Sequence, residues 1–316
     1  MNLAVLIIGY SRPAGITNLI KNLTQNGITR IYVSLDGPKN IRDIENQIII
    51  QNEIIKLSAN KNFQIKVLKQ ELNLGIAVAV IGAIDWFFSL EDCGLILEDD
   101  LVITSEFLAF ANSCLEKYSN DSNVWMISGS QLLSKFSSNS ETIWANYPMI
   151  WGWATWAQKW KEMRSSLISD KKTSFFQTVN YRYLYWKVGA KRVLSGKVDT
   201  WDTPLAFEFR VQNMFCILPP INLVSNMGFD EMASHTTSIG NGVGTPIEKS
   251  DKQINLTSNP DIIQVYRYNR KLESDIFKIR FRHLLLPFSS FLFDHFKFPK
   301  NTRQDVLRER IKLFKS

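Results

Sequence analysis

The sequence of 316 residues is long enough for one large domain or two small ones, and its 45% hydrophobic content is typical of a globular protein with an apolar core. This composition excludes an intrinsically disordered chain. The net charge of +7 is unevenly distributed, because residues 261–316 hold 13 of the 37 Lys and Arg but only 6 of the 30 Asp and Glu. The sequence therefore predicts a neutral body followed by a basic tail.

The cysteines and the N-terminal residues indicate in which cellular compartment the protein is expected. Cys93, Cys114 and Cys216 are scattered and odd in number, so they offer no metal-binding spacing and favour a reducing environment. The stretch MNLAVLIIGYSRP has neither a basic region nor a small-residue cleavage site, so we expect no export signal. No run reaches ~18 uninterrupted apolar residues, so we expect no membrane-spanning helix. These features predict a cytoplasmic protein.

The first 118 residues are predicted to alternate between strands and helices. Apolar runs predict strands at 3–9, 30–37, 63–70 and 94–100. Amphipathic or apolar helical patterns follow them at 15–27, 42–59, 73–88 and 105–118. This order predicts an α/β fold with a mainly parallel central sheet and helices on both faces.

Polar side chains stand at the predicted carboxyl ends of three of these strands. The three ends are followed in turn by Tyr10 and Arg12, by Asp36, and by Glu98, Asp99 and Asp100. Ligands of parallel α/β sheets bind beyond these ends, so the side chains are predicted to share one crevice. Neither G-x-G-x-x-G after the first strand nor G-x-x-x-x-G-K-[ST] is present, which excludes a dinucleotide fingerprint and a P-loop.

Three adjacent carboxylates end the apolar run of GLILEDDLV, residues 94–102. Such charges repel one another unless they are paired or bound to a cation. Mg²⁺ and Mn²⁺ favour oxygen ligands, and Mg²⁺ is usually held by one or two carboxylates together with substrate phosphates. The stretch therefore predicts half of a metal–diphosphate site, and the alternative is a solvated acidic loop.

The segment LILEDDL resembles the acidic motif of GT-A glycosyltransferases, in the Glu-Asp-Asp form of N-acetylglucosaminyltransferase I and its relatives. Bacterial sugar transferases look more similar still. Further segments are similar to the family in the same order, over roughly residues 1–240: IIGYSRP, YVSLDGP, YPMIWGWATWAQKW and TWDTPLAFEF. The resemblance implies a GT-A, Rossmann-like catalytic domain over 1–250, with a nucleotide-binding half at 1–103 and an acceptor half at 104–250. A basic, aromatic helical segment would follow at 251–316.

The resemblance also implies roles for the residues at the strand ends. Asp100 would ligate Mn²⁺ or Mg²⁺, Asp99 would hold the ribose or sugar hydroxyls of the donor, and Glu98 would orient the site. Asp36 would accept a hydrogen bond from the uracil ring, unless it is a turn residue of Asp-Gly-Pro. Arg12 would lie near the base or the diphosphate, with a solvated helix start as the alternative.

Tyr10, in the same N-terminal segment, is a further predicted nucleotide-sugar contact. In the aromatic segment, Trp151, Gly152 and Trp153 are the predicted sugar or acceptor contacts, because aromatic faces pack on sugar C–H groups and glycine allows close approach. Trp156 and Trp160 follow Trp153 at helical spacing and are predicted to be core residues of a helix.

An inverting sugar transfer needs a base that takes the proton of the acceptor hydroxyl. Within GKVDTWDTPLAFEFR, Asp202 is the base that the resemblance implies, and Asp199 is the alternative. A helix-capping role is also open in this stretch. If neither aspartate is a base, a retaining mechanism remains open.

Two later segments complete the predictions. GFDEMASHTTSIGNGVGTP, residues 228–246, is predicted to be a mobile loop from which His235 reaches the diphosphate or the metal, unless it is a bystander. FRHLLLPFSSFLFDHFKFPK, residues 281–300, combines phenylalanines with basic residues and fits the surface of an anionic membrane. The alternative is an amphipathic helix packed on the catalytic domain.

Together these features predict a metal-dependent glycosyltransferase of polysaccharide biosynthesis. It would move a sugar from a UDP-sugar to a hydroxyl of a glycan or lipid-linked glycan, with inversion, at the inner face of a bacterial cytoplasmic membrane. No nucleic-acid partner is expected. The alternatives are a sugar-nucleotide nucleotidyltransferase and a non-catalytic glycan- or membrane-binding protein.

Overall fold

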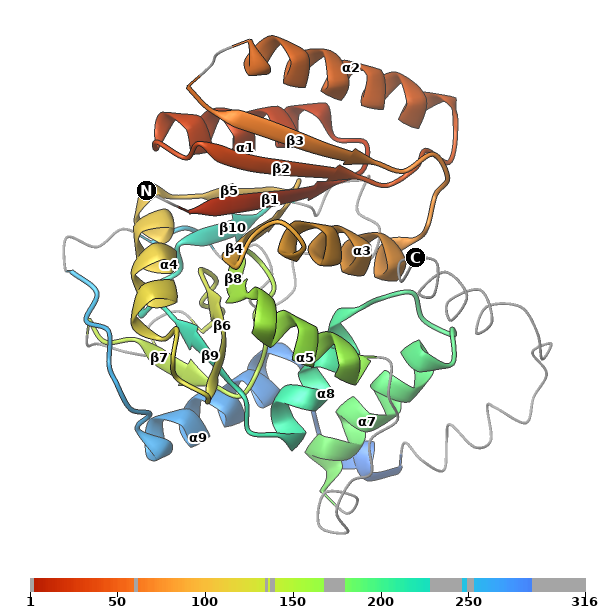
Figure 1. The fold of residues 1–316 in the computed structure, drawn as a ribbon. Coiled ribbons are helices and arrows are strands. Elements are labelled where there is room, and N and C mark those ends of the chain that lie inside the picture. The colour runs from red at the N-terminus through yellow and green to blue at the C-terminus, as the bar shows by residue number, and fades with distance from the viewer. Residues whose placement is uncertain are drawn as a thin grey trace.

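A computed structural model describes residues 3–59, 62–133, 136, 140–167, 180–227, 246–248 and 253–285. These residues form an α/β fold in which a large, mainly parallel sheet is covered by helices (Figure 1). The predicted fold class is confirmed. All eight elements predicted within the first 118 residues are present, in the predicted order.

The large sheet has eight strands: β1 (Ala4–Gly9), β2 (Arg30–Leu35), β3 (Gln64–Lys69), β4 (Cys93–Glu98), β6 (Val124–Ser128), β7 (Ile143–Ala145), β8 (Trp153–Trp156) and β9 (Phe215–Leu218). Their order is β3-β2-β1-β4-β8-β6-β9-β7. Strands β3, β2, β1 and β4 are parallel, whereas β8 runs antiparallel to β4 and β6. The chain thus places β2 and β3 on one side of β1 and β4 on the other, which makes the β1–β4 boundary a topological switch point where α/β proteins bind ligands.

A second, antiparallel pair joins β5 (Leu101–Ile103) to β10 (Val224–Asn226). The helices are α1 (Pro13–Gln25), α2 (Ile41–Ser58), α3 (Ile76–Phe88), α4 (Ser105–Lys117), α5 (Ala157–Leu167), α7 (Tyr181–Leu194), α8 (Asp202–Val211) and α9 (Ile262–Lys271). A π-helical turn η1 (Leu272–Ile276) and a 3₁₀ turn η2 (Phe281–Leu285) follow α9.

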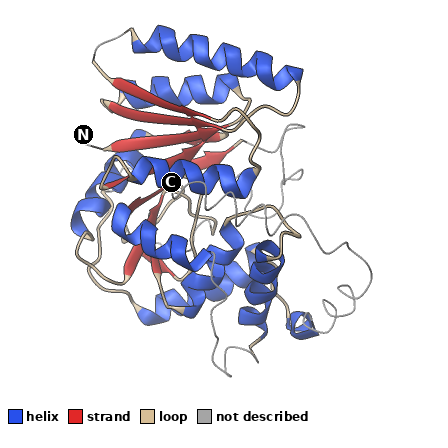
Figure 2. Ribbon diagram, turned by 45° about the vertical axis from the view of Figure 1, so that its right-hand side comes forward, coloured by secondary structure: helices blue, strands red, loops and turns tan. Residues whose placement is uncertain are grey.

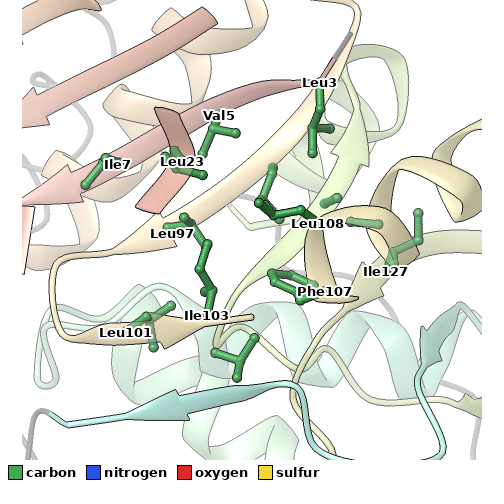
Figure 3. Packing of buried hydrophobic residues seen from close by; sticks show 14 of the residues in the cluster. Leu3, Val5, Ile7, Leu23, Leu97, Leu101, Ile103, Phe107, Leu108 and Ile127 are labelled. Atoms are coloured by element: carbon green, nitrogen blue, oxygen red, sulfur yellow. The ribbon is translucent and has the colours of Figure 1, made fainter. Parts of the chain in front are cut away.

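Alternation along the buried strands divides the core into two layers. Val5, Ile7 and Leu97 point to the layer that α1 and α4 complete (Figure 3). Leu6 and Ile96 point to the opposite layer, which α3, α5 and α8 complete. Helices therefore cover both faces of the sheet, as Figure 2 shows.

The aromatic segment differs from its prediction. Residues 153–156 form strand β8, and the helix begins only at Ala157. Trp160 is buried in α5, as expected for a core residue, but Trp153 reaches the same layer from the strand. Helical spacing of tryptophans could not reveal this change of element, because Trp153 on a strand and Trp160 on the following helix can be buried in one layer just as two residues of a single helix can.

The described part of the C-terminal segment packs into the body. Val265, Tyr268 and Leu272 are buried, and the Tyr268 hydroxyl donates to Oε1 of Gln131 at 3.0 Å. Residues 286–316, which hold most of the predicted membrane-surface segment, lie outside the described residues. Of the helices that the structure describes, none is both long and apolar enough to cross a bilayer.

A buried ionic group attaches this segment to helices α7 and α8. Glu273 of η1 is 2% exposed and lies 2.6 Å from Nε of Arg182 on α7 and 3.2 Å from Nη2 of Arg210 on α8. The Tyr147 hydroxyl donates to the same carboxylate at 2.8 Å. Removing one member of such a group leaves the remaining charges buried without compensation.

We expect Glu273→Ala to lower the free energy of unfolding by about 3–5 kcal/mol, because two guanidinium groups lose their counter-charge. Asp275→Ala is the matched control on the same turn. Its pair with Lys271 is half exposed, so we expect a change within about 0.5 kcal/mol. Denaturant unfolding of both variants measures the difference, and equal stabilities would contradict the structural role of Glu273.

Candidate functional site

The ends of β1 and β4 are locked together next to the acidic triplet. Ile8 of β1 is in register with Glu98 of β4, and the Asp99 amide donates to the Ile8 carbonyl at 3.0 Å. The Tyr10 amide in turn donates to Oδ2 of Asp99 at 3.0 Å. The turn from Asp99 to Asp100 is therefore fixed at the switch point of the sheet.

Arg12 supplies positive charge to this turn from the residue before α1. Its Nη1 lies 3.3 Å from Oδ1 of Asp99 and 3.1 Å from Oδ2 of Asp100. Helix α1 packs closely against this turn. A Cβ atom at Gly15 would lie only 1.9 Å from the Asp99 carbonyl oxygen, so there is no room for a side chain at this position. The predicted residues Arg12, Asp99 and Asp100 thus meet at one place.

Repulsion within the acidic group shows in its titration. Burial, reinforced by the charges of Asp100, Asp99 and Asp202, raises the pKa of Glu98 to about 8. Burial, reinforced by the charge of Asp100, raises the pKa of Asp99 to about 6. Asp202 therefore lies close enough to interact with the triplet although it comes from α8.

The set of donors at this turn suits a cation that is also held by phosphate. Among the described residues, no three His, Cys, Asp or Glu side chains converge to hold a metal ion by themselves. Asp99 and Asp100 nevertheless offer carboxylate oxygens at the end of a buried strand, which fits the one or two protein ligands typical of Mg²⁺ sites. A metal at this turn would be completed by the oxygens of a bound diphosphate.

The two aspartates proposed as the base occupy different positions. Oδ1 of Asp202 accepts hydrogen bonds from the hydroxyls of Thr200 at 2.6 Å and Thr203 at 3.3 Å. Asp199 instead accepts the amides of Ile76 and Ala77, both at 3.2 Å, at the start of α3. Asp202 is among the charges that raise the pKa of Glu98.

Asp36 is engaged by the chain itself. Its Oδ1 accepts the amides of Gly37 and Leu74 at 2.8 Å each, and its Oδ2 accepts from Nδ2 of Asn73 at 2.9 Å. These bonds join the turn after β2 to the turn before α3. The structure therefore places Asp36 in a turn, and its contact to the uracil ring stays a prediction.

Tyr10 lies in a network that the sequence did not reveal. Its hydroxyl donates to Oδ2 of Asp43 at 2.5 Å, and Nε2 of Gln47 donates to the carbonyls of Tyr10 at 3.1 Å and Asp36 at 2.7 Å. Asp43 and Gln47 belong to the buried face of α2 with Ile50 and Ile54. The sequence held one signal for this network, because Asp43 and Gln47 occupy positions of the helical repeat that are otherwise apolar.

The predicted sugar-contacting segment is largely internal. Trp153 is 1% exposed, and its ring packs against Trp160 and Trp201, so it offers no face to a sugar here. Gly152 has φ +65° and is packed against Phe107, so the glycine serves a tight turn. Trp151 is half buried and remains the predicted contact of the three with exposed surface.

His235 and most of its predicted loop lie outside the described residues. The last described residue before that loop, Met227, donates its amide to the Asp100 carbonyl at 2.8 Å. The last described residue before this predicted loop therefore lies directly beside the acidic turn.

Comparisons with known proteins leave the family open. No family model and no curated protein match the sequence. Similar solved structures include HddC from Yersinia pseudotuberculosis (15% identity, TM-score 0.28, 45% of this chain and 59% of that one). They also include the glycosyltransferase GlyE of Streptococcus pneumoniae TIGR4 (11%, 0.31, 96% and 66%) and a Bacillus anthracis protein described as a glucose-1-phosphate thymidylyltransferase (10%, 0.31, 51% and 74%). At these TM-scores no activity can be transferred, so the function must be inferred from this chain's own site.

We expect Gly15→Ala to disturb the acidic turn, although alanine is the better helix former. The added methyl group would meet the Asp99 carbonyl, so the free energy of unfolding should fall by about 1–3 kcal/mol. Asn18→Ala, on the exposed face of the same helix, should change it by less than about 0.5 kcal/mol. Denaturant unfolding tests both variants, and a Gly15→Ala protein as stable as wild type would contradict the close packing of α1 on this turn.

Proposed function

We propose that this protein is a metal-dependent glycosyltransferase that uses a nucleotide-diphosphate sugar, with UDP as the nucleotide that the sequence resemblance favours. The observation that carries the proposal is the acidic turn after β4, which lies at the switch point of the sheet and is held by Arg12, with Asp202 among the charges that raise the pKa of Glu98. A diphosphate needs positive charge around it, and this turn can supply it through Arg12 and a metal held by Asp100, while Asp99 holds the ribose or sugar hydroxyls of the donor.

In the proposed reaction, Asp202 is the general base. Two threonine hydroxyls orient its Oδ1, which leaves Oδ2 to accept the proton of the acceptor hydroxyl. The hydroxyl oxygen forms the new bond to the anomeric carbon while the bond to the nucleoside diphosphate breaks, with inversion. A bound Mn²⁺ or Mg²⁺ would offset the charge of the leaving diphosphate.

The remaining residues bind and orient the donor. Arg12 lies where its guanidinium can shift from the carboxylates to a diphosphate oxygen. In this proposal Glu98 orients the turn and Tyr10, two residues before Arg12, contacts the nucleotide sugar. Trp151 is the proposed contact to the sugar or acceptor, which would be a glycan or a lipid-linked glycan.

A sugar-nucleotide nucleotidyltransferase is the second candidate, because it too would place a metal and a nucleotide at such a turn. It would be expected to carry a glycine-rich phosphate loop after β1, and the segment there, GYSRPAG, offers only Gly9 and Gly15. Both glycines are explained by packing, since a Cβ at Gly9 would lie 2.5 Å from Ile16. This favours the transferase that consumes a nucleotide sugar.

The products distinguish the candidates. We expect release of UDP from a UDP-sugar in the presence of Mn²⁺ or Mg²⁺, loss of that activity in EDTA, and its restoration by added metal. Asp100→Asn should lose the activity, whereas Asp92→Asn, at the opposite and exposed end of β4, should keep it. Pyrophosphate formed from UTP and a sugar 1-phosphate would favour the nucleotidyltransferase instead, and full UDP release in EDTA would refute the metal site.

The base assignment is tested separately. We expect Asp202→Asn to lower kcat by about 10²–10⁴-fold while donor affinity changes little, because the amide preserves shape but cannot take a proton. Steady-state kinetics and calorimetric binding of UDP measure the two quantities. A turnover close to wild type would remove Asp202 from the mechanism.

A further inference from the structure

We propose that Asp199 is a positioning residue, which ties the start of α3 to the segment that carries Asp202. Asp199 would hold this segment across the crevice, so that Asp202 stays opposite the acidic turn. The inference rests on the proposed function for its effect on turnover, but the contact itself is independent of any activity.

The contact caps the N-terminus of α3, which has no capping side chain at its own N-cap position. The residue before α3 is Gly75, with φ +80° and no side chain to accept a hydrogen bond. The first amides of the helix need acceptors, and Asp199 supplies one oxygen to Ile76 and the other to Ala77. A side chain at Gly75 would interfere, because its Cβ would lie 2.8 Å from Oδ2 of Asp199.

Each residue from Asp199 to Asp202 has a defined contact. Thr200 donates its hydroxyl to Oδ1 of Asp202 at 2.6 Å. Trp201 is 4% exposed and stacks on Trp153 with ring centroids 5.8 Å apart and an angle of 26°. Trp153 is paired with Ile96 of β4, two residues before Glu98. The segment is thus attached to α3 at one end and to the strand next to β4 in the middle.

The hydrogen bonds of Asp199 argue against a role as the general base. Both of its carboxylate oxygens accept main-chain hydrogen bonds of α3, and a negative group at a helix start is favoured by the helix dipole. The single oxygen of an amide can still accept one of these bonds, and asparagine is among the preferred capping residues. A general base has no such substitute, because an amide does not take up a proton at neutral pH.

Three variants test the inference in the full-length protein. Asp199→Ala should lower kcat by about 10–100-fold with the Kd for UDP within about twofold, because a shift of ~1 Å in a reacting group can cost ~10² in rate. Asp199→Asn should keep turnover within about threefold of wild type, in contrast to Asp202→Asn. Val198→Ala is the matched control, since this neighbour is 37% exposed and should leave kcat unchanged.

Amide hydrogen exchange gives a readout that does not depend on activity. The amides of Ile76 and Ala77 should both exchange faster in Asp199→Ala, whereas Asp199→Asn, which has one oxygen to offer, should keep one of the two protected. Unchanged exchange in Asp199→Ala, or an Asp199→Asn variant as inactive as Asp202→Asn, would overturn the inference. If wild type releases no UDP from any nucleotide sugar, the proposed function fails, while the exchange rates still decide whether Asp199 ties the two segments together.

Discussion

The parallel pairing of β1 with β4 is the constraint on which the site depends. It sets Ile8 opposite Glu98, so the segments that follow β1 and β4 leave the sheet side by side. This brings Arg12 to Asp99 and Asp100. Both strands are buried by helices on either face, which makes this register costly to change. The positions of the charged groups are therefore decided by apolar packing rather than by the charges themselves.

Given that register, the acidic turn is electrostatically unfavourable by itself. Burial and mutual repulsion raise the pKa of Glu98 and Asp99, and Arg12 offers a single positive charge to the two aspartates of the turn. A cation that arrives with a diphosphate would relieve this repulsion. The proposed transfer rests on this turn and on Asp202, whose Oδ1 is oriented by the Thr200 hydroxyl.

Much of the nucleotide-side architecture could be predicted because it is local. Apolar runs and helical repeats define the first eight elements, and the acids of 98–100 stand out because they end a buried strand. Long-range contacts could not be predicted in the same way. Asp199 and Asp202 are three residues apart in similar surroundings, and only the fold shows that one bonds to the start of α3 and that the other raises the pKa of Glu98. Trp153 was equally ambiguous, since burial of an aromatic ring depends on Trp201 and Trp160, which come from other elements.

The most direct test of a shared metal–diphosphate site is the affinity for Mn²⁺ measured with and without UDP, in the wild-type protein and in Asp100→Asn. Because no three described side chains form a metal site alone, Mn²⁺ should bind weakly to the free protein. Its affinity should rise at least tenfold with UDP present, since the phosphate oxygens complete the ligand set, and Asp100→Asn should lose most of this gain. Mn²⁺ binding that is unaffected by UDP, or a gain that survives in Asp100→Asn, would contradict the account.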